Sequence, residues 1–332
     1  MTLTNQKVVL NNRPKGLPEI SDFLLVEAAV EQPTAGEVLV KVEHLGIDAF
    51  IATTLNHDGY HGQSGLREPV MAIGTGEVIA SQSPDLAVGD KVIGGMGAQT
   101  YRLANADQFQ KIDTSIVPAK TYLGLLGLTT GMTAYAGMHF VAGVKADDVV
   151  VVSAAAGAVG TVACQLAKLA GARVIGIAGG PEKCEFLQTI GCDAALDYKR
   201  GEVAQQLADA APQGIDVFFD NVGGDILDAA LGNISIGARV IICGAISQYG
   251  DLTSIQGPSL YLQLAERNAT MRGFTVDHYP ERYGQMQAEL AKLVAGGHLQ
   301  LPEHIEQGVQ SFPQALTRLY QGGHVGKLLV AA

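Results

Sequence analysis

The chain has 332 residues, enough for about two domains, and 41 of them are glycine, about 12% against an average near 7%. Hydrophobic residues make up 47% and charged residues 17%, a composition that excludes disordered and fibrous proteins. The formal net charge is −11 and no basic block stands out, so we expect a small-molecule ligand, no nucleic acid and no membrane surface as the main partner.

The sequence also predicts a cytoplasmic protein. No apolar run approaches the roughly 18 residues of a membrane span, and the first residues, MTLTNQKVVLNNRPKG, are polar without the apolar core of a signal peptide. The four cysteines, at 164, 184, 192 and 243, form no C-x-x-C pair. We therefore expect reduced thiols, with neither disulfides nor a thiolate metal site.

From Val8 to about Pro118 the pattern predicts short strands and turns. Apolar and polar residues alternate in EVLVKVEHLGID, TGEVIASQS, VGDKVIG and AQTYRLA, and Gly, Pro and Asp separate these runs. The first part of the chain is therefore expected to be an antiparallel all-β unit.

From Asp147 the pattern changes to alternating strands and helices. DVVVVS, ARVIGIAG and AALDY are continuous apolar strands, separated by the helices AVGTVACQLAKLA and PEKCEFLQTI, and EVAQQLADAA is a third helix. GIDVFFDNV, ARVIICGAI and MRGFTV supply three more strands. Six strands in this order predict a doubly wound, parallel dinucleotide-binding fold.

Two further segments complete the organisation. TYLGLLGLTTGMTAYAG is apolar and rich in glycine, and we expect it to form the helical lip of a cleft between the domains. The last 30 or so residues, ending GVQSFPQALTRLYQGGHVGKLLVAA, predict a short strand, a helix and a final strand that return to the first domain.

A phosphate-binding loop is predicted after the first strand of the second domain. Ala155-x-Gly157-x-x-Gly160 follows a β run and opens an amphipathic helix. Small residues let the backbone approach a pyrophosphate, and the helix N-terminus stabilises its charge. The spacing is the dinucleotide fingerprint with alanine at its first glycine, and its place between strand and helix makes it far more specific than the spacing alone.

The next strand indicates which cofactor is bound. A site for NAD usually ends this strand with an acid that binds the adenosine ribose, whereas this chain has Ile177-Ala178-Gly179-Gly180 and then Lys183. A lysine at a helix start opposes the helix dipole unless an anion compensates. Tyr198 ends the third strand and can close the same pocket. A solvated lysine and a packing tyrosine are the alternatives, but their joint placement favours NADP(H).

Five motifs in order now identify a family resemblance. AAAGAVG at 154–160, GGPEK at 179–183, DYK at 197–199, DNVGG at 220–224 and CGAISQY at 243–249 resemble the zinc-free medium-chain dehydrogenases and reductases of the leukotriene B4 12-hydroxydehydrogenase, prostaglandin reductase and alkenal reductase branch, which includes curcumin reductase. The resemblance covers nearly the whole chain.

The family's fold implies a GroES-like β-rich catalytic domain at 1–122 and 298–332, and a Rossmann NADP-binding domain at 123–297. The resemblance also implies the residues that bind the cofactor. These are Gly157, Ala158, Val159 and Gly160 at the pyrophosphate; Gly179, Lys183 and Tyr198 at the 2′-phosphate; Asn221, Cys243, Gly244, Ala245, Ile246, Ser247 and Tyr249 at the nicotinamide half; Phe274, Thr275 and Val276 over the nicotinamide; and Met132, Thr133 and His324 beside them. A homodimer is expected from the family as well.

The chain departs from the family at two places. The family usually has Asp-Pro-Tyr-Met-Arg where this chain has Asp48-Ala49-Phe50-Ile51-Ala52, beside the substrate pocket, and it typically has Asn where this chain has His324. Substrate preference therefore does not transfer from the named reductases.

No metal is expected. Zinc enzymes of this superfamily need Cys and His ligands in the catalytic domain, but no cysteine precedes residue 164. His44, His57 and His61 have no acidic or thiol partners at ligand spacing.

These features predict an NADPH-dependent reductase of the activated C=C bond of small, apolar α,β-unsaturated ketones and aldehydes. Hydride transfer to the β-carbon places negative charge on the carbonyl oxygen, so a neutral donor is needed there. Tyr249 is the first candidate, with packing on the nicotinamide as the alternative, and Tyr60 is the second unless it is only a rim residue. A zinc-free quinone oxidoreductase and a non-catalytic NADPH-binding protein remain open.

Overall fold

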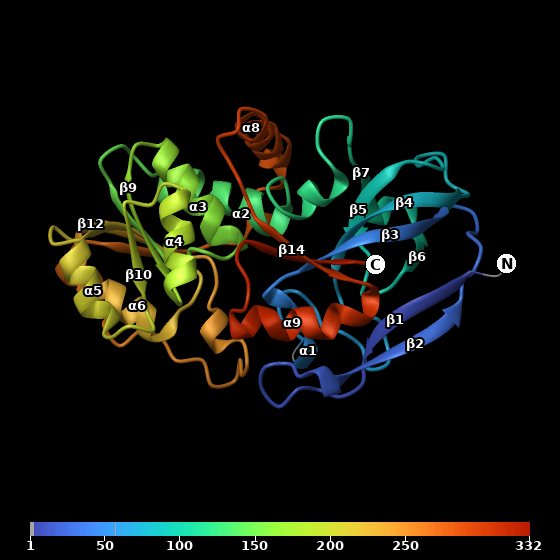
Figure 1. The fold of residues 1–332 in the computed structure, drawn as a ribbon, viewed down its shortest axis with the longest axis horizontal. Helices are drawn as coiled ribbons and strands as arrows, with labels where there is room; N and C mark the ends of the chain where they lie inside the picture. Colours follow the sequence, from blue (N-terminus) through green and yellow to red (C-terminus); the bar gives the residue numbers. More distant parts are fainter. Residues whose placement is uncertain (1–2, 57) are drawn as a thin grey trace. The chain divides into compact units, whose positions relative to one another are not determined.

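The structure is a computed structural model that describes residues 3–56 and 58–332. Its contacts divide the chain into two compact units (Figure 1). The first unit comprises the described part of Met1–Gly124 together with Tyr249–Leu252 and Glu303–Ala332, and the second comprises Leu125–Gln248 and Thr253–Pro302. The first unit is therefore discontinuous in sequence.

The first unit is built on β-structure. A two-stranded antiparallel ribbon joins β1 (Thr4–Leu10) to β2 (Phe23–Ala29). A seven-stranded sheet has the order β14-β15-β3-β4-β5-β7, with β6 paired to β3. Its strands are β3 (Glu37–Ile47), β4 (Ile73–Ser81), β5 (Lys91–Gly95), β6 (Tyr101–Asn105), β7 (Phe109–Lys111), β14 (Glu303–Gln307) and β15 (Lys327–Ala331).

The prediction of an antiparallel all-β unit needs one correction. Helix α1 (Phe50–Asn56) interrupts the strands after β3, and Ile51, Ala52 and Leu55 bury its apolar side. The last segment forms β14, helix α9 (Phe312–Gln321) and β15 as predicted. Because a helix connects β14 to β15, the two strands lie parallel, while β15 pairs antiparallel with β3.

A buried ion pair joins the last strand of the first unit to the segment that precedes α1. Lys327 is 1% exposed, and its Nζ lies 2.6 Å from Oδ1 of Asp48, which is also buried. A Cβ on Gly46 would lie 2.9 Å from the Asp48 carboxylate, so glycine leaves room for the pair. Neither charge can be removed alone without leaving the other uncompensated away from water.

The second unit contains a six-stranded parallel sheet, which confirms the predicted fold class. The strands are β8 (Val149–Val152), β9 (Arg173–Ala178), β10 (Ala194–Asp197), β11 (Ile215–Asp220), β12 (Ile234–Ile242) and β13 (Thr270–Gly273). Their order in the sheet is β10-β9-β8-β11-β12-β13. This is the doubly wound order: successive strands are added on one side of β8 up to β10 and then on its other side from β11 onward, so the strand order reverses between β8 and β11.

Helices precede, connect and follow these strands. They are α2 (Thr133–Tyr135), α3 (Ala158–Leu169), α4 (Pro181–Thr189), α5 (Val203–Ala210), α6 (Gly224–Leu231), α7 (Gln263–Glu266) and α8 (Tyr283–Ala295). The segment predicted to be helical, 121–137, contains a 3-10 turn at Ala119–Leu123 and wide π-helical turns at Leu128–Met132 and Ala136–Ala142 on either side of α2. Its predicted place at a cleft stays a prediction.

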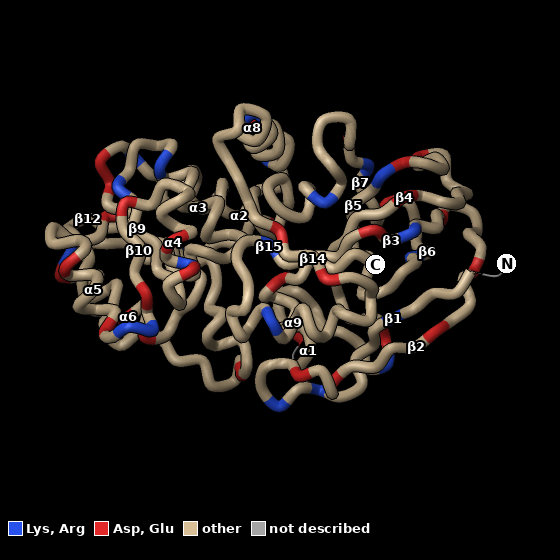
Figure 2. The backbone as a smooth tube through the Cα atoms, viewed as in Figure 1, with Lys and Arg blue, Asp and Glu red and all other residues tan. Residues whose placement is uncertain are grey.

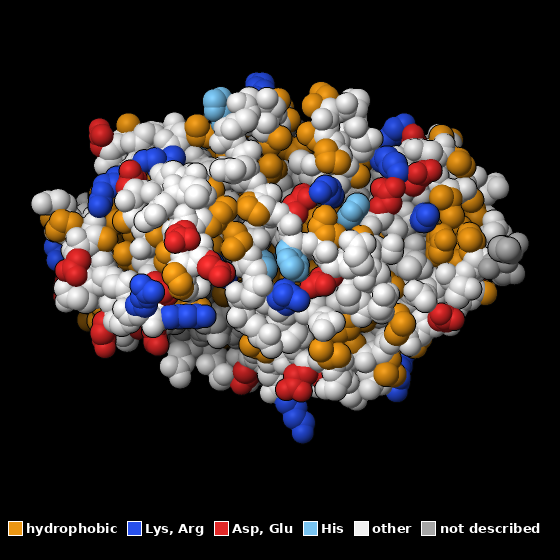
Figure 3. Space-filling view, viewed as in Figure 1, with side chains coloured by type: hydrophobic (Ala, Val, Ile, Leu, Met, Phe, Trp, Pro, Cys, Tyr) orange, Lys and Arg blue, Asp and Glu red, His pale blue; other side chains and the backbone are white. Residues whose placement is uncertain are grey.

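Charged residues of both signs are spread along both units (Figure 2). On the face drawn in Figure 3, hydrophobic, acidic and basic side chains are likewise intermixed. Among the described residues, no helix is both long enough and apolar enough to cross a membrane.

The buried ion pair gives a prediction for stability. Lys327→Met leaves the Asp48 carboxylate buried without its partner, so the free energy of unfolding should fall by about 3–5 kcal/mol. Lys111→Met is the matched control, because Lys111 pairs with Asp90 while its own side chain is 62% exposed, and its loss should cost less than about 1 kcal/mol. Urea denaturation followed by circular dichroism measures both, and equal losses would contradict this account of the buried pair.

Candidate functional site

The predicted ligand-binding residues of the second unit converge on one edge of its sheet. Each strand of the sheet is followed by residues that the sequence assigned to the site, and the carboxyl ends of parallel strands share one edge (Figure 1). These residues are Gly157–Gly160 after β8, Gly179 and Lys183 after β9, Tyr198 after β10, Asn221 after β11, Cys243–Ser247 after β12 and Phe274–Val276 after β13. Their order along the edge brings the loops after β8 and β11 to the crevice where such sheets bind ligands.

The predicted phosphate loop lies at the N-terminus of α3. Gly157 is the N-cap residue, Ala158 and Val159 begin the helix, and no acidic side chain lies in its first turn. Ala154 adopts a left-handed backbone with φ 47°, which costs an alanine about 1 kcal/mol or more. This strained turn leads into the N-terminus of α3, where the first backbone N–H groups have no partner within the helix and can donate to a ligand.

The space around Gly160 indicates whether this loop fits a dinucleotide. A Cβ at position 160 would lie 2.4 Å from the Ala154 carbonyl oxygen and 2.7 Å from the Ala155 Cα. Only glycine therefore lets α3 approach the turn after β8 so closely, which is the role of the last glycine in the dinucleotide fingerprint. The residues present fit a pyrophosphate.

The ends of β9 and β10 form the predicted 2′-phosphate pocket. A Cβ on Gly179 would lie 2.8 Å from the Tyr198 ring, so the absence of a side chain at 179 lets the tyrosine cross the end of β9. The Asp197 carboxylate accepts hydrogen bonds from Gly180 N–H (2.8 Å) and Lys199 N–H (3.0 Å). This acid is therefore engaged with the local backbone.

Lys183 supplies positive charge in this pocket. Its side chain is half-buried, and burial together with the nearby charge of Lys199 lowers the pKa of its ammonium group. Within the described residues, no Asp or Glu oxygen lies within 4 Å of Lys183. A cation held beside another cation without a carboxylate fits a phosphate group better than a ribose hydroxyl.

Asp220 and Ser153, to which the sequence analysis gave no role, organise the loop after β11. The Asp220 carboxylate accepts hydrogen bonds from Ser153 Oγ (2.8 Å), Val222 N–H (3.0 Å) and Gly223 N–H (3.0 Å). Asn221 donates from its backbone N–H to Ser153 Oγ (2.7 Å) and from Nδ2 to the Ser153 carbonyl (2.7 Å). The available signal was the acid that ends the strand IDVFFD.

The loops after β11 and β12 are joined to each other. Ile246 N–H donates to the Asn221 carbonyl (3.1 Å), and Ser247 Oγ donates to the Val222 carbonyl (2.6 Å). Cys243 lies beside them, and burial together with the charge of Asp220 raises the pKa of its thiol to about 12. Cys243 therefore stays a thiol at neutral pH and is no nucleophile.

Five predicted residues lie in the helical segment and after the end of β13. The Phe274 ring packs edge-on against Phe219 with centroids 6.3 Å apart. Met132 is buried, and Thr133 Oγ1 donates to the Leu128 carbonyl (2.7 Å) within its own helical segment. Contact of Met132, Thr133, Thr275 or Val276 with a ligand stays a prediction.

Tyr60, Tyr249 and His324 belong to the first unit. Tyr60 is 62% exposed and packs edge-on against His61 with ring centroids 5.0 Å apart. Tyr249 precedes Gly250, which lies beside Leu17. Burial is the main cause that raises the pKa of Tyr320, and Tyr249 is close enough to Tyr320 to add to that rise. The sequence interpretation placed Tyr249 with the second domain, whereas its contacts group it with the first unit.

Among the described residues, no group of three or more His, Cys, Asp or Glu side chains is arranged to hold a metal ion. His44 is half-buried, and burial is the main cause that lowers the pKa of its imidazole. His61 packs against Phe50 with centroids 4.7 Å apart. His57 lies outside the described residues.

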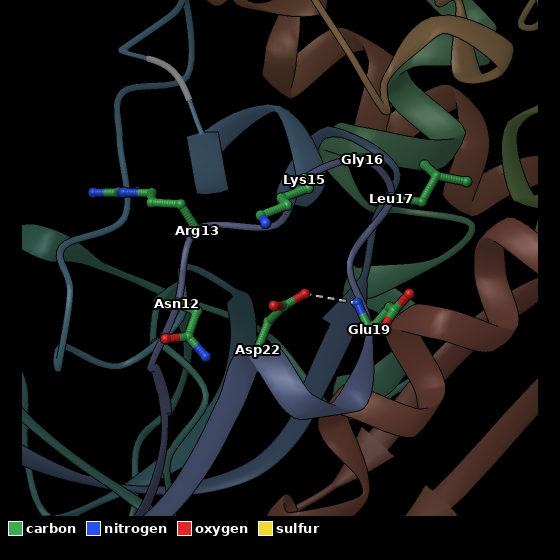
Figure 4. Close-up of a pocket in the computed structure, with 7 residues that line it drawn as sticks. All are labelled: Asn12, Arg13, Lys15, Gly16, Leu17, Glu19 and Asp22. Atoms are coloured by element: carbon green, nitrogen blue, oxygen red, sulfur yellow. Dashed lines mark hydrogen bonds between the residues drawn. The ribbon is translucent and has the colours of Figure 1, made fainter.

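A surface cavity of about 570 Å³ lies in the first unit, and two of its lining residues, Gly16 and Leu17, lie beside Gly250, which follows Tyr249. Figure 4 shows the lining residues, among which the Asp22 carboxylate accepts a hydrogen bond from Glu19 N–H (2.9 Å). Its lining mixes both signs of charge and comprises Asn12, Arg13, Lys15, Gly16, Leu17, Glu19 and Asp22. Arg13 is committed elsewhere, because its Nη1 donates to the carbonyls of Leu55 and Ser64.

Comparison with known proteins gives consistent matches over the whole chain. A family model described as a zinc-binding dehydrogenase matches residues 158–292, and one described as the N-terminal domain of oxidoreductases matches residues 6–112. The chain is 33% identical to the NADPH-dependent curcumin reductase of Escherichia coli (strain K12), covering 98% of this chain and 96% of that protein. It is 34% identical to the NADP(+)-dependent 2-alkenal reductase of Nicotiana tabacum, covering 99% and 97%. The crystal structure of CurA from Vibrio vulnificus in complex with NADPH matches with a TM-score of 0.92 at 34% identity, covering 98% and 99%.

Proposed function

The chain belongs to the zinc-binding-dehydrogenase family, in the branch of zinc-free enone and alkenal reductases among the medium-chain dehydrogenases and reductases, and on that basis we propose what it reduces and how. The proposed substrates are small, apolar α,β-unsaturated ketones and aldehydes, whose activated C=C bond is reduced without a metal. Hydride would be transferred to the β-carbon. Curcumin and 2-alkenal reductases are named relatives that cover the whole chain.

The chain is an oxidoreductase with NADP(H) as its cofactor. Gly157–Gly160 at the start of α3 would hold the pyrophosphate, and Lys183 with Tyr198 would hold the 2′-phosphate. Asn221 and the loop after β12 would face the nicotinamide half. When bound, the reduced cofactor supplies the hydride.

One observation carries the preference for the phosphorylated cofactor. The strand that is usually followed by a ribose-binding acid is followed here by Gly179 and Gly180, and then by Lys183, a half-buried ammonium group beside Lys199. A carboxylate at this strand end would repel a 2′-phosphate, while an ammonium group binds it.

The protein's part in the chemistry is to stabilise charge on the carbonyl oxygen of the substrate. We propose that Tyr249 Oη donates a hydrogen bond to that oxygen as negative charge develops. Tyr60 is the second candidate donor, since its side chain is largely exposed in the loop after α1. A neutral phenol suits this task because it donates without first losing a proton.

A substrate panel tests the function. Oxidation of NADPH and of NADH is followed with enones, enals and quinones, and the products are identified by mass spectrometry. A saturated ketone formed from an enone with NADPH supports the proposal. Quinone consumption without enone turnover would instead identify a quinone oxidoreductase, and cofactor binding without turnover of any acceptor would identify a non-catalytic protein.

Lys183 gives a prediction for cofactor choice. Lys183→Met removes a charge-assisted contact to the 2′-phosphate, so the KM for NADPH should rise about 10- to 100-fold, while the KM for NADH stays unchanged. Lys292→Met is the matched control, because Lys292 lies on α8 with its side chain 71% exposed. Equal use of NADH and NADPH by the unaltered enzyme would refute the assignment of Lys183 and Tyr198.

Tyr249 gives a prediction for turnover. Tyr249→Phe removes the hydroxyl and keeps the ring, so kcat should fall by about 10²- to 10³-fold with little change in the Kd for NADPH. Tyr261→Phe removes a hydroxyl from a tyrosine that is 58% exposed, and it should leave kcat unchanged. An unaltered kcat in Tyr249→Phe would remove Tyr249 from the mechanism.

We also propose that the enzyme works as a homodimer in the cytoplasm. β13 is an edge strand that pairs with β12, and all four of its residues are exposed, which leaves its outer side available to a second copy. Light scattering should then give twice the 34.7 kDa mass of one chain. A single-chain mass would rule out the homodimer.

A further inference from the structure

We propose that the Asp220 carboxylate acts on the cofactor site in two ways: it positions the loop after β11, and its charge makes the site bind NADP⁺ more tightly relative to NADPH. The inference rests on the proposed function, since it concerns the same cofactor. Asp220 is the last residue of β11 and is completely buried. The reaction described above gives it no role.

The positioning role follows from the hydrogen bonds that Asp220 accepts. The Asp220 carboxylate accepts hydrogen bonds from Ser153 Oγ, just after β8, and from the N–H groups of Val222 and Gly223 in the loop after β11. Asp220 therefore links the carboxyl ends of β8 and β11, the neighbouring strands between which the strand order reverses. Gly223 and Gly224 have φ of 73° and 55°, so this loop has a backbone conformation that glycine adopts readily.

The same hydrogen bonds fix the orientation of Asn221. Ser153 Oγ donates to Asp220 and accepts the Asn221 N–H, and the Asn221 Nδ2 donates to the Ser153 carbonyl. One amide N–H of Asn221 is thus committed to the Ser153 carbonyl, which leaves its Oδ1 and its second amide N–H for a ligand. The side chain therefore has a fixed orientation.

The charge role follows from what surrounds the carboxylate. Burial raises the pKa of the Asp220 carboxyl above its ordinary value, and the three neutral groups that donate hydrogen bonds to it oppose this rise by favouring the ionised form. Within residues 3–56 and 58–332, no Lys, Arg or His nitrogen lies within 4 Å of it. The negative charge is thus held in a low-dielectric interior without a counter-ion, where it acts over a longer distance than it would in water.

That charge distinguishes the two forms of the cofactor. The nicotinamide ring carries a positive charge when oxidised and none when reduced, and the loops after β11 and β12 are the proposed site of that half. A buried anion there stabilises the oxidised ring and leaves the reduced ring nearly unaffected. Asp220 would therefore favour loss of hydride from the bound cofactor.

Calorimetric titration of the purified protein with NADP⁺ and with NADPH tests the inference. Asp220→Asn keeps the shape and removes the charge, so the Kd for NADP⁺ should rise about tenfold more than the Kd for NADPH. A merely structural role would raise both Kd values by the same factor. An unchanged ratio of the two Kd values would overturn the charge role.

Asp216→Asn is the matched control. Asp216 lies four residues earlier on β11, about 13 Å along the strand, and accepts hydrogen bonds from Ser235 Oγ (2.6 Å) and Val149 N–H (2.8 Å). It thus offers the same change on the same strand, far from the carboxyl edge. Its two Kd values should keep the ratio found in the unaltered protein, and an equal shift in both variants would overturn a local effect of Asp220.

Two further variants keep the test decisive. If Asp220→Asn does not fold, Asp220→Ser removes the same charge and keeps a hydroxyl that can accept from Gly223 N–H, and the same change of ratio is expected. Ser153→Ala retains the charge and loosens the loop, so it should raise both Kd values together; no change in either would overturn the positioning role. An unaltered protein that binds neither form would refute the proposed function itself.

Discussion

The close approach of α3 to the turn after β8 is the constraint on which the site depends. It requires a residue without a side chain at 160, because any Cβ there would meet the Ala154 carbonyl. It also requires Ala154 in a left-handed conformation. With α3 in this place, its N-terminus lies at the same sheet edge as the loops after β9 to β13, which is where we propose that the cofactor binds.

A positive and a negative side chain lie at different places along this edge of the sheet. Lys183 lies after β9 and is half-buried beside another lysine, which suits it to an anion. Asp220 lies at the end of β11 and is buried among neutral donors, which suits its surroundings to a cation. A cofactor with a phosphate at one end and a ring that becomes cationic at the other matches this distribution, and would be bound in a single direction along the edge.

The sequence predicted the second unit better than the first. Buried parallel strands have a continuous apolar pattern, so DVVVVS and IDVFFD were recognised, and helix-strand alternation then determined the sheet. Helix α1 was missed because seven residues between strands carry too little periodicity. Asp220 and Ser153 were missed because only the sheet register brings residues 67 apart together. For the same reason, no local pattern assigned Tyr249 to the first unit.

The pairing of β15 with β3 has a consequence for the order of folding. The two strands lie about 280 residues apart in sequence. β3 pairs early with β4 and β6, but its stretch His44–Ile47 lacks its β15 partner until the C-terminal segment has been synthesised. The second unit is nearly continuous in sequence and can complete its sheet earlier, as domains commonly do during synthesis. A nascent chain would therefore expose the unfinished edge of β3 for most of its translation, and this edge is where chaperone protection would matter most.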